Sequence, residues 1–324
     1  MSVPSIYHTI ISVIRNKYSA NRRKRLSEYM NFIQDPDLIA DMIVRLLENH
    51  EPCMIGRIGA NELQAVLPFL NLTERRSPIA YIKGEYPAWW VSEGSKKRLH
   101  ANAGFFPPTR QNIERFATLM IEDIRAIDML GVWQEEERFI LPLAENAELV
   151  RLRYLEPFWS RRPWTAALKD KKVLVVHPFA ESIRNQYEKH LSGSLLFNNP
   201  ETLPEFSTFN VIRSVQSIGP SSENSGFKDW FEALDYMKGE IDRYEYDVCL
   251  IGCGAYGFPL AAHIKRRGKK AVHLGGALQL LFGIKGKRWE QNPSYSDLIR
   301  DNWIRPQGRE VLPSANNVEG GCYW

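Results

Sequence analysis

The order of apolar and polar positions predicts helices and strands that alternate along most of the chain. Between residues 38 and 47, apolar side chains recur at three- and four-residue spacing, which is one face of a helix. Asp35 suits the cap of this helix, and Pro36 suits its first position because it has no N–H group to satisfy. We therefore expect the first clear helix to begin at Pro36.

The pattern is less regular between residues 53 and 160. The apolar residues 53–55 predict a short strand, which a glycine turn joins to a helix over about residues 61–70. Residues 75–110 are rich in proline, glycine and aromatic residues, and we expect a partly irregular segment that walls a cleft. Further helices are expected at residues 111–130 and 144–156.

After Pro163 the succession of strands and helices becomes clear. Strands are predicted at residues 172–176, 209–215, 247–251 and 270–274, and helices from Ser182, at 227–241 and at 259–267. This succession predicts an α/β, Rossmann-like fold, with a largely parallel sheet and helices on both faces. Ligands of such sheets bind beyond the carboxyl ends of the strands.

Composition and pattern divide the chain into a basic N-terminal arm (1–30), an N-terminal α/β half (31–160) and a Rossmann-like C-terminal half (161–324). Residues 1–25 contain six basic side chains and no acidic one, whereas the rest of the chain has 36 basic and 38 acidic residues. Charge confined to an arm does not predict a broad nucleic-acid-binding surface. Its apolar residues and the run at 22–25 fit either a peripheral contact with an anionic membrane surface or a solvated arm.

Several functional classes lack their usual residues. Four cysteines at irregular spacing fit neither a disulfide scaffold nor a zinc site, and we expect buried, reduced thiols. The sequence has no stretch of about 18–20 apolar residues, no signal-peptide pattern and no Walker, zincin, nucleophile-elbow or kinase motif. We therefore expect a cytoplasmic protein.

Two glycine-rich turns follow predicted strands of the C-terminal half. Gly252, Gly254 and Gly257 fit G-x-G-x-x-G, with Tyr256 inside the motif. Such a turn brings backbone N–H groups close to a phosphate, although a tight packing turn without a ligand has the same pattern. A dinucleotide site also needs a carboxylate at the end of the next strand, where this chain has His273-Leu274-Gly275-Gly276. Gly275, Gly276 and Gln279 form the second turn, and we expect both turns to line one cleft.

Arg57, Gly59, Asn61 and Glu62 form a polar strand-to-helix turn. Arg57 has the donor geometry to hold a diphosphate. Glu62 is suited to bind a divalent cation or to accept a proton, but a glutamate in a first helical turn also stabilises the helix dipole without any chemistry.

Other polar residues are weaker candidates. His177 follows a predicted strand and is a candidate substrate ligand or a structural residue, and Glu181 comes four residues later. The basic residues Lys285, Lys287 and Arg288 fit either phosphate contacts or a solvated loop.

The turn at residues 57–62 is similar to the R-F-G-D-G-E-like turn of GT-D-fold glycosyltransferases. Proteins in the neighbourhood of that family also resemble this chain in four later segments: VLVVHPF at 173–179, GCGAYGFPL at 252–260, HLGGALQLLFGIKGKRW at 273–289 and VEGGCYW at 318–324. The resemblance spans most of the chain beyond about residue 50. It implies transfer of a sugar from a nucleotide-sugar, often with Mn²⁺ or Mg²⁺, to a surface-polysaccharide or other glycan acceptor, which can be lipid-linked.

The chain departs from the family pattern at Ala60, which replaces the first carboxylate of the D-x-E pair. Either another acid substitutes, for which Glu85 is the candidate, or catalysis rests on Arg57 and backbone dipoles. The aromatic residues at 81–90 are expected to stack on the sugar or base, and the aromatic end of the chain is expected to pack back on the body. Two other functions stay open: an NAD(P)-dependent oxidoreductase that uses the turn at 252–257, and a non-catalytic nucleotide-sugar-binding partner.

Overall fold

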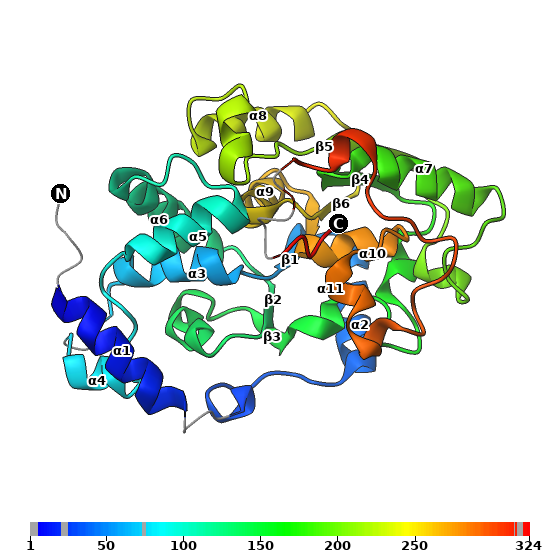
Figure 1. Cartoon of the computed structure of the whole chain (residues 1–324). Coiled ribbons are helices and arrows are strands. Elements are labelled where there is room, and N and C mark those ends of the chain that lie inside the picture. Colours follow the sequence, from blue (N-terminus) through cyan, green and yellow to red (C-terminus); the bar gives the residue numbers. More distant parts are fainter. Residues whose placement is uncertain (1–5, 21–24, 73–75, 314, 316–319) are drawn as a thin grey trace.

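The computed structural model describes residues 6–20, 25–72, 76–313, 315 and 320–324. Within these residues, one all-parallel sheet has the strand order β3-β2-β1-β7-β6-β4-β5 (Figure 1). The strands are β1 (Cys53–Gly56), β2 (Met129–Val132), β3 (Glu148–Arg151), β4 (Lys172–His177), β5 (Thr208–Arg213), β6 (Val248–Ile251) and β7 (Lys270–His273). The predicted α/β, Rossmann-like fold with a parallel sheet is confirmed.

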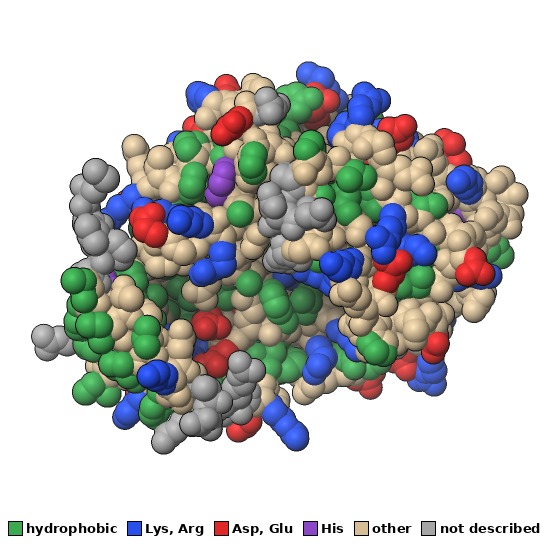
Figure 2. All heavy atoms as spheres, in the orientation of Figure 1, with side chains coloured by type: hydrophobic (Ala, Val, Ile, Leu, Met, Phe, Trp, Pro, Cys, Tyr) green, Lys and Arg blue, Asp and Glu red, His purple; other side chains and the backbone are tan. Residues whose placement is uncertain are grey.

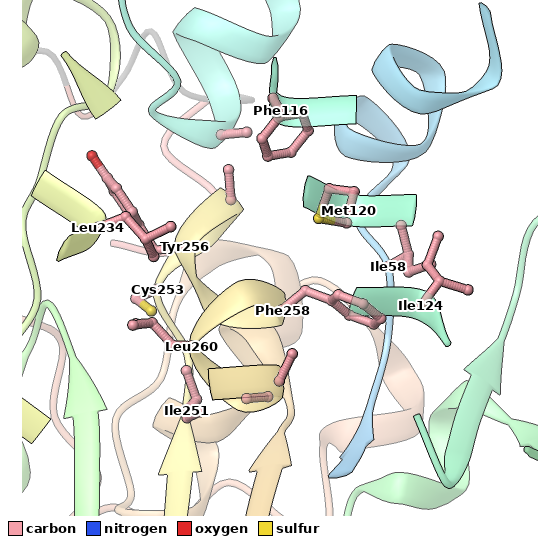
Figure 3. Packing of buried hydrophobic residues seen from close by; sticks show 14 of the residues in the cluster. Ile58, Phe116, Met120, Ile124, Leu234, Ile251, Cys253, Tyr256, Phe258 and Leu260 are labelled. Carbon is pink, nitrogen blue, oxygen red and sulfur yellow. The ribbon is translucent and has the colours of Figure 1, made fainter. Parts of the chain in front are cut away.

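Helices cover both faces of the sheet, and the alternation of side chains along β4 shows why. Val173 and Val175 point into one core, whereas Leu174 and Val176 point into the other. The first core includes residues of α2 (Pro36–Glu48), α7 (Ala180–Leu191), α10 (Leu278–Leu281) and α11 (Lys287–Glu290). The second includes residues of α3 (Ala60–Val66), α5 (Glu93–Ala103), α6 (Arg110–Ile124), α8 (Trp230–Ile241) and α9 (Gly257–Arg266). In Figure 3, residues of α6 and α9 meet on this second face.

The strand order creates a crevice at the carboxyl ends of β4 and β6. The chain leaves β4 through α7 toward the edge strand β5, but it leaves β6 through α9 in the opposite direction, toward β7. Two neighbouring strands whose connections diverge form a topological switch point, which is where open α/β sheets bind ligands. His177 ends β4, and the turn that starts at Gly252 follows β6.

The two predicted halves contribute to the same sheet. Residues 31–160 supply β1–β3, and residues 161–324 supply β4–β7. They join where β1 pairs with β7, with Met54 opposite Ala271. The turn at Arg57–Glu62, which follows β1, is thereby brought beside the glycine turn that follows β7.

The predicted helices and strands agree best with the structure where a cap or a clear apolar pattern marks the element. Asp35 caps α2, because its side chain accepts hydrogen bonds from the N–H groups of Asp37 and Leu38 at 2.9 and 3.1 Å. The helix expected at 144–156 is wrong, since the edge strand β3 lies there and a short 3₁₀ turn, Leu152–Leu155, follows it. The helix expected at 111–130 ends at Ile124, and β2 begins at Met129. Four-residue strands are too short to display a period of their own.

Of the two alternatives for the N-terminal arm, a solvated arm does not describe residues 6–20. They form the helix α1 (Ile6–Ala20), which packs on α4 (Pro78–Ile82). The ring of His8 stacks on Trp90 with centroids 4.2 Å apart. Arg22, Arg23 and Lys24 lie outside the described residues. Within the described part of the chain, no helix has the length and apolar character needed to cross a membrane.

Candidate functional site

A cavity of about 160 Å³ lies at the carboxyl ends of β1, β4, β6 and β7, at the crevice described above. Eleven of the predicted site residues line it: Arg57, Gly59, Asn61, Glu62, His177, Gly252, Gly254, Tyr256, Gly275, Gly276 and Gln279. Residues from four separate turns thus converge on one hollow. This agrees with the expectation that the two glycine turns share a cleft.

Arg57 is held against the rim of the cavity by the loop after β2. Its guanidinium carbon lies 5.1 Å from the ring centroid of Trp133, and its side chain passes beside Gly275. The indole N–H of Trp133 donates to the carbonyl of Ile58 at 3.1 Å, which ties the Trp133 loop to the turn that carries Arg57.

Glu137 holds the Trp133 loop in place through hydrogen bonds to its backbone. Its Oε2 accepts hydrogen bonds from the N–H groups of Trp133 and Gln134, at 2.7 and 2.8 Å. Burial raises the pKa of the Glu137 carboxyl to about 7, while those two hydrogen bonds and the charge of Arg57 act in the opposite direction. The position of Arg57 is therefore set by two elements that are distant in sequence.

Glu62 lies in the first turn of α3 with its side chain 8% exposed. Its carboxylate folds back over the Cα atom of Gly59, where a side chain at residue 59 would overlap it. Among the described residues that line the cavity, Glu62 is the only one with a carboxylate side chain. Across the described chain, no three His, Cys, Asp or Glu side chains are grouped so as to hold a metal ion. The residues present do not fit a protein-bound cation, which also requires several oxygen ligands.

Two buried histidines line the cavity with opposite tautomers. Burial lowers the pKa of His177 to about 3, and burial together with the charge of Arg57 lowers that of His273 to about 3, so both rings are neutral. Nδ1 of His177 accepts the N–H of Phe179 at 3.0 Å, which leaves the proton on Nε2. Nδ1 of His273 lies 3.2 Å from the carbonyl of Ile251, which can only accept, so His273 carries its proton on Nδ1.

At the glycines of the two turns, neighbouring protein atoms leave little or no room for a side chain. A Cβ atom at Gly252 would lie 2.5 Å from the carbonyl oxygen of Gly275, so the two turns touch each other. At Gly276 it would overlap the ring of Tyr323, and at Gly257 the ring of His273. At Gly257 and Gly276, packing against a protein ring therefore explains the missing side chain, and of the two only Gly276 lines the cavity.

Other predicted site features lie elsewhere. Gly257 is buried in the first turn of α9 and does not line the cavity. Glu85 is exposed and also lies outside the lining, so it does not replace the missing carboxylate at residue 60. Trp89 and Trp90 pack with Tyr81 and α1 rather than facing the cavity. The reason is that these half-buried rings pack in a separate layer with α1 and α4.

Tyr256 lines the cavity but also has a packing role. Its ring stacks on Trp230, with centroids 5.1 Å apart, and its hydroxyl lies 2.6 Å from Oγ of Ser217.

The end of the chain forms part of the wall, as its aromatic residues predicted. Tyr323 and Trp324 line the cavity, and we call residues 320–324 the tail. Nε2 of Gln279 donates to the carbonyl of Tyr323 at 3.2 Å, and the N–H of Lys287 donates to that of Trp324 at 3.3 Å. Figure 1 shows the end of the chain beside α10.

Glu310 anchors this part of the chain to α7. Its carboxylate accepts hydrogen bonds from the N–H groups of Glu181 and Ser182, at 2.8 and 3.2 Å, and from the hydroxyl of Ser182. Its backbone carbonyl accepts the indole N–H of Trp324 at 2.8 Å. The free N–H groups at the start of α7 are thus occupied by a protein carboxylate.

Several lining residues were not predicted as ligands. Trp133 follows β2, a strand that the apolar pattern does not predict, and the segment Ser214–Ile218 follows β5. Arg288 belongs to the basic loop whose role was left open; its guanidinium lies 4.8 Å from the ring centroid of Tyr323. Lys285 and Lys287 do not line the cavity. Polar residues immediately after a strand were the signal for Ser214 and Ser217.

The charge of the lining favours an anionic ligand. Among the described residues of the lining, the charged side chains are Arg57, Arg288 and Glu62 and the two histidines are neutral, so basic side chains outnumber acidic ones by one. Ser214 is 4% exposed, and its buried Oγ lacks a hydrogen-bond partner. The same segment, Ser214–Gln216, also lines a second, adjoining hollow of about 460 Å³.

Comparisons with protein-family models, curated proteins and solved structures found no match to this chain. The resemblance to the GT-D-fold glycosyltransferases consequently rests on the quoted motifs.

Proposed function

We propose that this protein is a glycosyltransferase that takes a sugar from a nucleotide-sugar donor and transfers it to a glycan acceptor. The observation that carries the proposal is the convergence of Arg57, Arg288 and Glu62 on one cavity at the topological switch point of a parallel sheet. Two arginines suit a diphosphate, because the planar guanidinium pairs with phosphate oxygens through parallel hydrogen bonds.

In the proposed reaction, an acceptor hydroxyl forms a new bond to the anomeric carbon of the donor sugar. The bond from that carbon to the diphosphate breaks, and the nucleoside diphosphate leaves with the bonding electrons. The proton of the hydroxyl passes to Glu62, and Arg57 and Arg288 stabilise the charge that develops on the diphosphate. Trp133, Tyr323 and Trp324 supply aromatic faces at the cavity for a sugar or base.

The two hollows suit a donor and an acceptor. The donor occupies the cavity with the arginines, and the acceptor approaches through the adjoining hollow that shares Ser214–Gln216. Because the described residues offer one carboxylate at the cavity, no step is assigned to a metal ion. We expect chelation by EDTA to leave donor affinity unchanged within about twofold.

The first test measures binding of a panel of UDP-, GDP- and CMP-sugars by thermal shift and calorimetry, with and without Mn²⁺. A ligand at 100 times its Kd raises the free energy of unfolding by about 2.7 kcal/mol, which a thermal shift detects readily. Arg57→Ala is expected to weaken donor binding by about 10- to 100-fold, since it removes a charge-assisted pair. Arg125→Ala, at an exposed position outside the cavity, is the matched control and is expected to bind as the wild type does.

The second test separates binding from chemistry through slow hydrolysis of the donor, with water as the acceptor. Glu62→Gln is expected to bind the donor within about threefold of the wild type and to lose about 100-fold or more of its hydrolysis. Full hydrolysis by this variant would remove Glu62 from the mechanism.

Two outcomes would replace the proposal by one of its rivals. Tight binding of NADH without binding of any nucleotide-sugar would favour an oxidoreductase. Binding of a nucleotide-sugar that the wild type never consumes would favour a non-catalytic partner.

A further inference from the structure

The helix α1 is fixed to the body of the protein along one side only. Ile11 is 5% exposed, and Oγ of Ser12 lies 3.1 Å from the hydroxyl of Tyr81. Arg15 turns toward the same side: its guanidinium donates to the carbonyl of Tyr86 at 3.3 Å and pairs with Glu136 at 3.5 Å. Together with the stacking of His8 on Trp90, these contacts determine which face of α1 points outward.

The outward face of α1 is a continuous apolar stripe. It consists of Ile6, Tyr7, Ile10, Val13 and Ile14, residues that are 77%, 46%, 52%, 49% and 44% exposed. Their spacing of three and four residues places them on one side of the helix. Ile79 belongs to α4, the helix that packs against α1, and is 66% exposed. We call these six residues the α1 face. They are half of the large hydrophobic residues that the described chain exposes, and Figure 2 shows hydrophobic side chains gathered over α1 and α4.

Basic residues accompany the α1 face. The sequence has no acidic residue before Glu28, but it has Lys17 and the run Arg22-Arg23-Lys24-Arg25 directly after the helix. Of these, Lys17 and Arg25 are exposed, and residues 22–24 lie outside the described part. On the side of α4, Arg76, Lys83 and Glu85 are exposed, and Glu74 and Arg75 lie outside the described part. Segments 1–27 and 73–85, which contain α1 and α4, hold nine basic residues and two acidic ones, so positive charge predominates in the sequence around the stripe.

We propose that the α1 face docks on an anionic phospholipid membrane. A helix that lies in a membrane interface has an apolar face, which enters the boundary of the acyl chains, and basic residues, which pair with anionic head groups. A second copy of this chain is a poorer occupant. In a two-fold symmetric dimer the same patch meets itself, so both copies would bring their basic residues, with few acidic partners, to one interface. This inference does not depend on what the cavity binds.

The test is co-sedimentation of the full chain with vesicles of phosphatidylcholine, with and without about one-third phosphatidylglycerol. We expect partition onto the anionic vesicles to exceed partition onto the neutral ones by about tenfold or more. It should fall in about 0.5 M NaCl, because salt screens the basic residues. Equal partition onto both vesicles, or none, would overturn the proposal.

Two paired variants locate the contact. The double variant Ile10→Gln, Ile14→Gln is expected to lose about tenfold of the partition. The control is Leu191→Gln, Leu195→Gln, which changes residues of similar exposure, 49% and 46%, at the end of α7 and just beyond it, and is expected to partition as the wild type does. All positions are solvent-exposed, so unchanged melting temperatures should show that both variants fold.

Wild-type partition by the α1 variant would refute the assignment of the face. A wild-type dimer that this variant converts to a monomer, without vesicle binding by either, would show that a second copy is the occupant instead.

Discussion

Replacing Gly257 with alanine is expected to destabilise the protein, because the added methyl group has no space beside the ring of His273. The new Cβ atom would lie 2.5 Å from Nδ1 and 2.9 Å from Nε2 of the ring, and closer still to Cε1. The ring is buried and held by its hydrogen bond to the carbonyl of Ile251, so it has little freedom to move away. Gly257 already has a negative φ of −60°, which means that the backbone itself would tolerate alanine.

Overpacking of this kind costs about 1–3 kcal/mol, and alanine regains up to about 1 kcal/mol of helix propensity over glycine. An overlap this close places the cost near the upper end of that range, so the free energy of unfolding should fall by about 2 kcal/mol, which denaturation by urea measures as a lower midpoint with an unchanged slope. The matched control is Gly239→Ala in α8, where no atom lies within 4 Å of the added Cβ. The same substitution should be neutral there or stabilise by up to about 1 kcal/mol.

A second measurement tests whether the His273 ring is the cause. In a His273→Ala background the obstacle is absent, so the additional cost of Gly257→Ala should disappear. An equal cost with and without the ring, or wild-type stability of Gly257→Ala itself, would refute this explanation.

Three further predictions concern caps, the tail and protonation. Glu310→Ala should lower the free energy of unfolding by about 3 kcal/mol, because the N–H groups of Glu181 and Ser182 and the hydroxyl of Ser182 lose their acceptor. It should also make the tail more sensitive to proteases. Asp35→Ala should cost about 1 kcal/mol through loss of the α2 cap, measured by urea denaturation, and no loss would contradict the cap. His177 and His273, with pKa values near 3, should show no ring titration by NMR between pH 8 and pH 5, and a titration of either ring in that range would contradict its burial as a neutral group. Since each folded pKa lies below the unfolded value of about 6.5, protonation favours the unfolded chain, and each ring removes about 2 kcal/mol of stability between pH 7.5 and pH 5.

The sequence by itself determined the class of fold and the position of the candidate site. Buried strands such as β4 are continuous apolar runs, and Asp35-Pro36 starts a helix through contacts within a few residues. Such local signals also located the turns after β1, β6 and β7, and parallel strands necessarily bring their carboxyl ends to one edge. Eleven candidate ligands could be placed in one cavity for this reason.

Only the tertiary structure decided what surrounds those turns. A glycine motif shows where the chain has no side chain, but it does not show whether a ligand or another residue occupies that space. At Gly257 the space is occupied by the ring of His273, and at Gly276 by the ring of Tyr323. Contacts between segments far apart in the chain place Arg288 at the cavity and Glu85 outside it. The strand β3 and the packing of α1 also depend on distant partners. Periodicity reports which face of an element is apolar, whereas the choice of partner for that face is made by the whole fold.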